Sequence, residues 1–117
     1  MKDKTKHYLF VCYGNLNRSK AAEDICRQTV ADLNLPIRCD SAGMSPAAET
    51  TINKELCENA DIIFVMEEYM KENITTHFGQ PAGKIIVLDI PDMYARTDPV
   101  LRQMLSEKLS SYLTAKA

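Results

Sequence analysis

A cysteine, an arginine and a serine stand at positions whose spacing suits chemistry on an anion. Cys12 ends a short apolar run, Arg18 follows six positions later, and Ser19 opens a helix-like pattern. A loop between a strand and a helix gathers backbone N–H groups around its centre, and the helix N-terminus adds partial positive charge. A guanidinium at the end of such a loop matches two phosphate oxygens at once. The segment therefore predicts a phosphate-binding loop.

The same loop suits Cys12 as a nucleophile. A positive field that attracts phosphate also favours thiolate over thiol, and the thiolate is the form that attacks. One piece of backbone would then bind the substrate and activate the attacking atom. The alternative is a buried cysteine at a strand end with Arg18 in a surface contact, which leaves Gly14 and Asn15 in the same short loop unexplained.

Strand-like and helix-like segments alternate along the chain and position this loop. Apolar, β-branched runs predict strands at 7–12, 37–43, 61–66 and 84–90. Helices are predicted from Ser19 to near Asn34, around 51–59, from Met66 to Gly79, and from Asp98-Pro99 onward, with a loop at 44–51. This alternation predicts one α/β domain over residues 1–117, a three-layer α/β/α arrangement around a four-stranded parallel sheet.

The segments after three of these strands are candidates for one shared site. They are 12–18, 40–43 and 89–94. Because sites in parallel sheets lie beyond the carboxyl ends of the strands, we expect these three segments to meet at one crevice.

Composition and cysteine spacing exclude several classes of protein. The 117 residues are 45% hydrophobic and 26% charged with net charge −2, so neither a nucleic-acid partner nor a membrane partner is expected. The apolar run within the first fifteen residues is too short for a signal peptide, which favours a cytoplasmic protein. The four cysteines form no Cys-x-x-Cys pair and lie far from both histidines, so no metal site is predicted. Cys26 and Cys57 fall on apolar helix faces and are predicted to be free core thiols.

Four stretches of the sequence resemble one known family. The segment "FVCYGNLNRS" (10–19) resembles the phosphate-binding loop of low-molecular-weight protein tyrosine phosphatases, and "DSAG" (40–43), "ADIIFVMEE" (60–68) and "VLDIPDMY" (87–94) follow in the family's order. The likeness is greatest to a shortened bacterial branch. It implies a small four-stranded parallel sheet flanked by helices, and a phosphomonoesterase that needs no metal or other cofactor. The implied partners are a phosphotyrosine protein or another aryl phosphate, with phosphate or sulfate bound in the loop.

The resemblance also assigns roles to residues. Cys12 resembles the nucleophile that becomes a cysteinyl phosphate, and Arg18 resembles the clamp on the phosphoryl oxygens. Asn15 resembles the asparagine that holds the loop's shape, and Ser19 the hydroxyl that stabilises the thiolate. The implied substrate-binding set is Tyr13, Gly14, Asn15, Leu16, Asn17, Ser19 and Tyr94.

Departure of a phenolate requires a proton, and three aspartates near the fourth predicted strand are candidate acids. Asp98 precedes Pro99 and is explained as a helix cap, and Asp89 falls inside the predicted strand. Asp92 matches the acid position of the family and is the favoured candidate, although a plain turn aspartate after Pro91 is the alternative.

The chain also departs from the family pattern. Asn17 stands where many members carry a second cysteine, and Lys20, predicted to be solvated, stands where proline is usual. The short stretch 44–59 lacks the aromatic wall of longer members, so Tyr13 and Tyr94 are either stacking surfaces or ordinary surface tyrosines. Leu16 is bulky and aliphatic, like the residue at the matching loop position of tyrosine phosphatases. In related enzymes that hydrolyse phosphoarginine, the residue at that position resembles threonine.

Two other functions remain open at this point. One is a module that binds phosphate or phosphotyrosine with little turnover. The other is an arsenate reductase, which shares the loop but needs further cysteines in a mobile segment after the third strand. No cysteine follows Cys57, which disfavours that chemistry.

Overall fold

Strands and helices alternate along the chain as the sequence predicts. The computed structural model describes residues 5–114, so the expectation about a leader in the first fifteen residues falls partly outside the described residues. The elements are β1 (Lys6–Cys12), α1 (Arg18–Leu33), β2 (Ile37–Gly43), α2 (Lys54–Asn59), β3 (Ile62–Val65), α3 (Glu68–Phe78), η1 (Ala82–Lys84), β4 (Ile85–Val87) and α4 (Pro99–Leu109).

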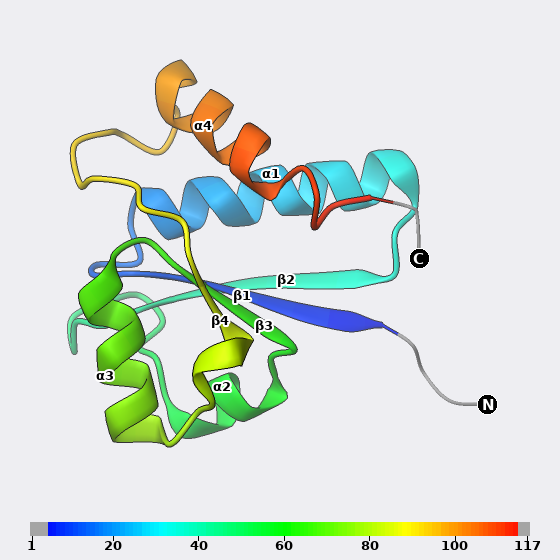
Figure 1. The fold of residues 1–117 in the computed structure, drawn as a ribbon. Helices are drawn as coiled ribbons and strands as arrows, with labels where there is room; N and C mark the ends of the chain where they lie inside the picture. The colour runs from blue at the N-terminus through cyan, green and yellow to red at the C-terminus, as the bar shows by residue number, and fades with distance from the viewer. Residues whose placement is uncertain (1–4, 115–117) are drawn as a thin grey trace.

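The four strands form one sheet in the order β2-β1-β3-β4, and every neighbouring pair is parallel. Helices α1 and α4 lie on one face of the sheet, and α2 and α3 lie on the other (Figure 1). The predicted three-layer α/β/α fold is thus confirmed. Because β1 and β3 lie in the middle of the sheet and are covered on both faces, their central residues are apolar, whereas the edge strand β2 carries Arg38, Asp40 and Ser41.

An aromatic cluster forms the centre of the core. Phe10 and Phe64 occupy paired positions on β1 and β3, and their rings stack with centroids 5.1 Å apart. Tyr8 and Tyr112 each meet Phe64 edge-on, and the Tyr8 hydroxyl donates to the Tyr112 carbonyl at 2.9 Å. Burial raises the pKa of Tyr8. These contacts fasten the segment after α4 to the middle of the sheet.

Helix ends follow the predicted signals. Helix α1 ends at Asn34 and α3 at Gly79, both in the left-handed conformation (φ 54° and 64°). Asp98 caps α4, because its carboxylate accepts a hydrogen bond from the Val100 N–H at 2.8 Å.

Two predicted boundaries are too wide. The strand expected at 84–90 is only Ile85–Val87, because the chain turns away at Asp89, where φ is 60°. The helix expected around 51–59 begins at Lys54, because Thr51 pairs with Gly43 and Asn53 caps the helix through Leu56 N–H.

The prediction that Cys26 is a free core thiol is wrong. Cys26 on α1 is bonded to Cys39 on β2, with their Cα atoms 6.1 Å apart. The helix face is apolar as predicted, but sequence spacing does not show that a cysteine on the adjacent strand lies opposite it. Cys57 is free and buried, as predicted, and burial raises its pKa to about 11.

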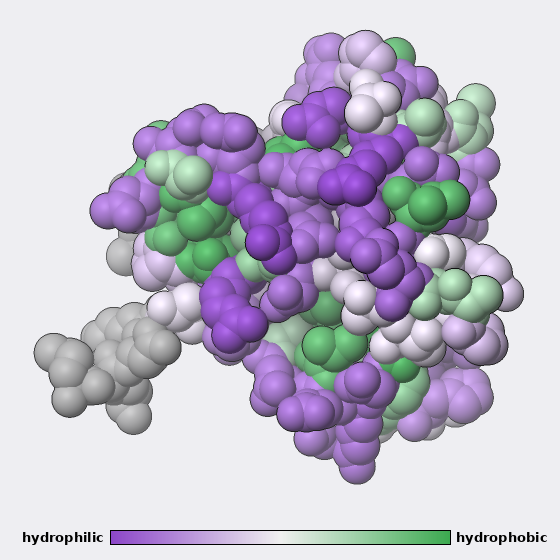
Figure 2. Space-filling model, turned by 180° about the vertical axis from the view of Figure 1, so that it is seen from behind, coloured by the Kyte–Doolittle hydropathy of each residue, from purple (hydrophilic) through white to green (hydrophobic). Residues whose placement is uncertain are grey.

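The surface carries no dominant apolar face in the view from behind. Hydrophilic side chains cover most of it, and hydrophobic ones form separate patches (Figure 2). Within residues 5–114, none of the helices combines the length and the apolar character that crossing a membrane requires.

Candidate active site

The segments after β1, β2 and β4 meet at one edge of the sheet. The Asn15 side chain contacts Ser41, and the Arg18 guanidinium contacts the Ile90 carbonyl. Asp40 does not join them, because its carboxylate is directed toward Arg27 at 3.8 Å. The loop after β1, the end of β2 and the segment after β4 therefore lie together, as expected.

Cys12 is almost fully buried at the floor of the loop, with 3% of its surface exposed. Its sulfur accepts the Asn15 N–H at 3.2 Å and lies 3.0 Å from the Ser19 hydroxyl oxygen. The sulfur therefore has two neighbours that can donate a hydrogen bond to it.

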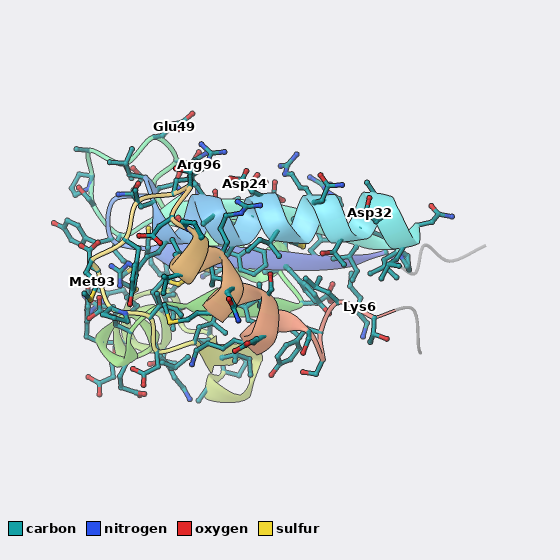
Figure 3. The ribbon with its side chains drawn as sticks, turned by 90° about the horizontal axis from the view of Figure 1, so that it is seen from above. Lys6, Asp24, Asp32, Glu49, Met93 and Arg96 are labelled. Atoms are coloured by element: carbon teal, nitrogen blue, oxygen red, sulfur yellow. A yellow bond between two sulfur atoms is a disulfide. The ribbon has the colours of Figure 1, made fainter. Side chains whose placement is uncertain are left out.

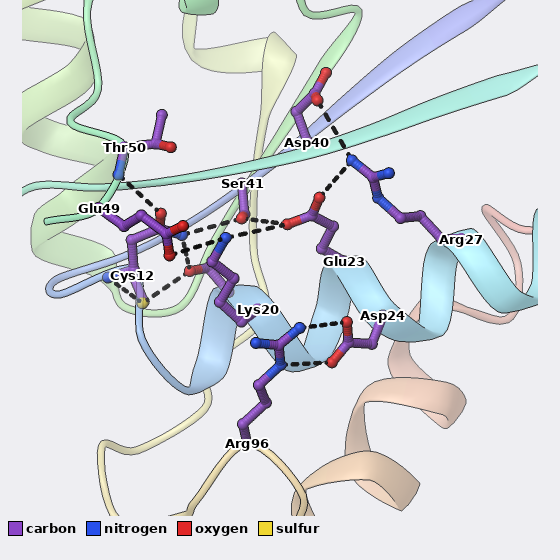
Figure 4. Close-up of polar contacts among 12 residues, drawn as sticks. Cys12, Lys20, Glu23, Asp24, Arg27, Asp40, Ser41, Glu49, Thr50 and Arg96 are labelled. Carbon is purple, nitrogen blue, oxygen red and sulfur yellow. Dashed lines mark hydrogen bonds and ion pairs between the residues drawn. The ribbon is translucent and has the colours of Figure 1, made fainter.

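The Asn15 side chain holds the loop in shape. Its backbone is left-handed (φ 53°), a conformation that asparagine tolerates better than most residues. Its side-chain amide donates to Ser19 Oγ at 2.9 Å and to Ser41 Oγ at 3.0 Å, and its carbonyl accepts Thr50 N–H at 3.2 Å. The loop is thus tied to α1, β2 and the 44–51 loop at once (Figure 4).

These bonds determine which way the hydroxyl protons point. Ser41 donates to Glu23 Oε1 at 2.5 Å and accepts from Asn15. Ser19 likewise accepts from Asn15, which leaves its own proton free for the Cys12 sulfur. The network therefore orients the Ser19 hydroxyl as a donor to Cys12.

Gly43 explains why "DSAG" ends in glycine. A Cβ atom on Gly43 would lie 2.7 Å from the Tyr13 carbonyl oxygen and 2.8 Å from the Asn15 nitrogen. Such distances are shorter than any normal contact, and backbone atoms cannot move aside as a flexible side chain does. The close approach of β2 to the loop therefore requires glycine.

Arg18 is buried, and its guanidinium is fixed by hydrogen bonds to other segments. It is 2% exposed, and its Nη1 donates to Glu67 Oε2 at 2.6 Å and to the Ile90 carbonyl at 2.7 Å. The first turn of α1 contains no acidic residue, so no carboxylate on that turn offsets the partial positive charge at the helix start. The loop therefore offers an anion a fixed guanidinium and a helix N-terminus.

Of the three candidate acids, only Asp92 forms an ion pair with the loop. Its Oδ1 lies 3.8 Å from Arg18 Nε, and 69% of its side chain is exposed. Asp98 is occupied as a helix cap, as predicted. Asp89 was predicted to lie inside a strand, which is wrong, because it is exposed and lies two residues beyond β4.

Apolar side chains surround the loop at the surface. Tyr13, Leu16 and Met93 are 51%, 69% and 70% exposed, whereas Tyr94 is half-buried and packs against the core. Met93, Arg96 and Glu49 lie toward one end of the molecule and Lys6 toward the other (Figure 3). Tyr94 is therefore supported by the core, whereas the side chains of Tyr13 and Leu16 are largely exposed to solvent.

Two findings go beyond the sequence prediction. Lys20, predicted to be solvated, is only 18% exposed and forms ion pairs with Glu49 at 3.4 Å and Glu23 at 4.0 Å. Glu67, which orients Arg18, was not identified, nor was the role of Glu23 behind Ser41. Glu67 follows β3 at the same sheet edge as the other site residues, so the strand-end rule was the signal that could have found it.

The fold and the loop define a class: small parallel α/β proteins with an anion-binding loop after the first strand. The family described as low molecular weight phosphotyrosine protein phosphatase matches residues 7–56. A low molecular weight protein-tyrosine-phosphatase, PtpB of Staphylococcus haemolyticus, is 29% identical, with 92% of this chain and 94% of that protein covered. Both comparisons show that this chain is similar to low-molecular-weight protein tyrosine phosphatases.

Two solved structures share the fold. The tyrosine phosphatase Wzb from Escherichia coli K30, in complex with phosphate, matches with a TM-score of 0.77 and 20% identity, over 97% of this chain and 99% of Wzb. The YwlE arginine phosphatase, as a mutant with a phosphorylated active-site serine, matches with a TM-score of 0.73 and 22% identity, over 92% of this chain and 95% of YwlE. Because a tyrosine and an arginine phosphatase both share this fold, the fold alone does not select the substrate.

Proposed function

We propose that this protein is a cysteine-dependent phosphomonoesterase that acts on phosphotyrosine in proteins. The observation that carries the proposal is the buried loop in which Asn15 N–H and Ser19 both contact the Cys12 sulfur, with Arg18 fixed at the loop's end. The similarity to low-molecular-weight protein tyrosine phosphatases supports the same activity.

In the first step, the Cys12 thiolate attacks phosphorus while the bond from phosphorus to the phenolic oxygen breaks. Arg18 and the loop N–H groups stabilise the charge on the phosphoryl oxygens. Asp92, protonated, gives its proton to the departing oxygen, so tyrosine leaves neutral and the enzyme holds a cysteinyl phosphate.

In the second step, water attacks the cysteinyl phosphate and Asp92 takes a proton from that water. The sulfur–phosphorus bond breaks and Cys12 returns as a thiolate, which the Ser19 hydroxyl stabilises. Inorganic phosphate then leaves the loop. In this proposal Arg18 and the loop N–H groups are the donors to the phosphoryl oxygens.

The loop's rim supports an aryl substrate. Leu16 and Tyr13 are exposed beside the loop, and Tyr94 is backed by the core, so a phenyl ring can pack between apolar surfaces. The guanidinium of a phosphoarginine would place a polar group against the same surfaces. We therefore favour phosphotyrosine over phosphoarginine.

The test is hydrolysis of p-nitrophenyl phosphate and of a phosphotyrosine peptide in the presence of EDTA. We expect turnover that is lost in Cys12→Ser, by about 10⁴-fold or more, as when a covalent nucleophile is removed. Activity that survives this substitution would reject the mechanism. Tight phosphate binding without a burst of phenolate would identify a binding module, and faster turnover of a phosphoarginine peptide would overturn the choice of substrate.

We propose a cytoplasmic location for this reaction. A lasting Cys26–Cys39 disulfide is uncommon in that compartment, where thiols are kept reduced. Trapping free thiols at the moment of lysis tests the location, since a cytoplasmic protein is expected to yield Cys26 and Cys39 in the reduced form.

A further inference from the structure

The candidate acid lies on a segment without regular structure. Residues 88–98 form neither helix nor strand, and Asp92 extends from this segment with most of its side chain in water. An acid must lie within hydrogen-bond reach of the leaving oxygen to be useful. Something other than secondary structure must therefore hold residues 91–95, here called the Asp92 segment.

One end of the Asp92 segment is attached at Ile90. Its N–H donates to the Met66 carbonyl at 2.9 Å, and its carbonyl accepts Arg18 Nη1 at 2.7 Å. This attachment connects the segment directly to the phosphate clamp.

The other end is attached at Arg96 by a set of bonds to α1. The guanidinium forms a bidentate pair with Asp24, in which Nε donates to Oδ2 at 2.7 Å and Nη2 donates to Oδ1 at 2.8 Å. Figure 4 shows Arg96 reaching from its loop to Asp24 on the helix. The hydrogen bond from Arg96 lowers the pKa of Asp24, so the pair is charged at neutral pH.

A third bond joins Arg96 to the phosphate loop itself. The Arg96 backbone N–H donates to Asn17 Oδ1 at 3.1 Å. Asn17 is the N-cap residue of α1, and an asparagine in this position usually caps its own helix. Here its side chain makes no capping bond and instead holds the other loop.

We infer that Arg96, fastened to Asp24 and Asn17, is a positioning residue that holds the Asp92 segment over the phosphate loop. The inference rests on the proposed function, because it gives the segment its catalytic purpose. An isolated surface ion pair contributes little to stability. This pair attaches one end of the segment that carries the acid, so we expect its effect to be on the rate instead.

The kinetic test compares Arg96→Ala, Asp24→Ala and the double variant on aryl phosphates whose leaving groups range from good to poor. We expect kcat/KM to fall about tenfold to 10²-fold for poor leaving groups, the scale of a 1 Å misplacement, and to change little for the best one. The double variant should lose no more than either single variant. Arg96→Lys, which keeps the charge but not the two-pronged bond, should be intermediate, and the inhibition constant of inorganic phosphate should stay unchanged.

Arg38→Ala is the matched control, because Arg38 forms an exposed Arg–Asp pair with Asp40 at 3.8 Å, on β2. Equal losses on good and poor leaving groups, or additive losses in the double variant, would overturn the inference.

A second measurement does not depend on turnover. Hydrogen exchange in peptides spanning 88–98 should accelerate in Arg96→Ala and stay unchanged in Arg38→Ala, because the Met93 N–H bonds only locally, to Pro91, at 3.1 Å. Unchanged exchange in Arg96→Ala overturns the inference even if the wild type is an active phosphatase. If the wild type shows no Cys12-dependent turnover, the proposed function fails, and the exchange result still decides whether Arg96 holds the segment.

Discussion

Two segments at the same sheet edge are built in opposite ways. In the phosphate loop, Cys12, Asn15 and Arg18 are each at most 3% exposed, and their side chains are bound to partners on several elements. In the Asp92 segment, Asp92 and Met93 are about 70% exposed, and the hydrogen-bonded attachments lie at its two ends, with the Asp92–Arg18 ion pair and the packing of Tyr94 between them.

The difference matches two separate demands. Stabilising the charge on a phosphoryl group requires donors that are already in place, so reorganisation at the moment of reaction is avoided. The segment that carries the proton donor must instead leave room for substrate to enter and for product to leave. Changes in the first segment should therefore affect both folding and catalysis, and changes in the second should affect catalysis alone.

The largest expected effect separates rate from stability. Asp92→Ala should lower kcat/KM for poor leaving groups by about 10²–10⁴-fold, because a general acid contributes on that scale. The thermal midpoint should stay at the wild-type value, since the side chain is exposed. Asp92→Asn is a second variant that keeps the side chain's size. Parallel measurements on alkyl and nitrophenyl phosphates check the result, and a large fall in thermal stability would break the comparison.

The next effect concerns the disulfide that links α1 to β2 behind the phosphate loop. Replacing both Cys26 and Cys39 with serine should lower the free energy of unfolding by about 3 kcal/mol, because the closed loop spans 13 residues. Urea unfolding measures the loss. Thiol titration of the purified, air-oxidised wild type, unfolded without reductant, should find two free thiols, and finding four would contradict the bond.

Gly43→Ala tests how tightly β2 packs against the phosphate loop. The added methyl would meet two backbone atoms, so we expect about 2 kcal/mol of destabilisation together with weaker phosphate binding. Gly83→Ala is the matched control, because nothing lies within 4 Å of its added carbon and its backbone is not left-handed. Unfolding measures the stability of both variants, and phosphate inhibition measures their phosphate binding. If both variants give the same values, the close contact at Gly43 is not what requires glycine there.

The smallest effect is the pH dependence of the Asp24–Arg96 pair. The pKa of Asp24 is lowered in the folded protein, so the pair contributes stability above the unfolded carboxyl value of about 3.9 and loses it as pH falls through the folded pKa. Because the pair is partly exposed, we expect less than about 1 kcal/mol. The stability difference between wild type and Asp24→Asn should be constant from pH 6 to 8 and shrink below about pH 4. A difference that grows in acid would contradict the assignment.

Much of the site could be predicted because it is local in sequence. Cys12, Asn15, Arg18 and Ser19 lie within eight residues, where loop geometry and helix start are governed by near neighbours. The order of strands and helices was likewise predictable from apolar runs and from caps such as Asp98. The lengths of strands and helices were less predictable. A left-handed residue at Asp89 ends β4 early, and a bridge at Thr51 delays the start of α2.

Contacts between distant residues were decided by the tertiary structure alone. The disulfide, the Arg18–Glu67 pair and the Arg96–Asp24 pair join residues on different elements, and each needs the packed sheet and helices to bring its partners together. By itself the sequence determined the chemistry of the phosphate loop, because that depends on residue type and short-range backbone geometry. Only the folded structure decided which groups support that loop and hold the acid near it, because side chains far apart along the chain become neighbours only through packing.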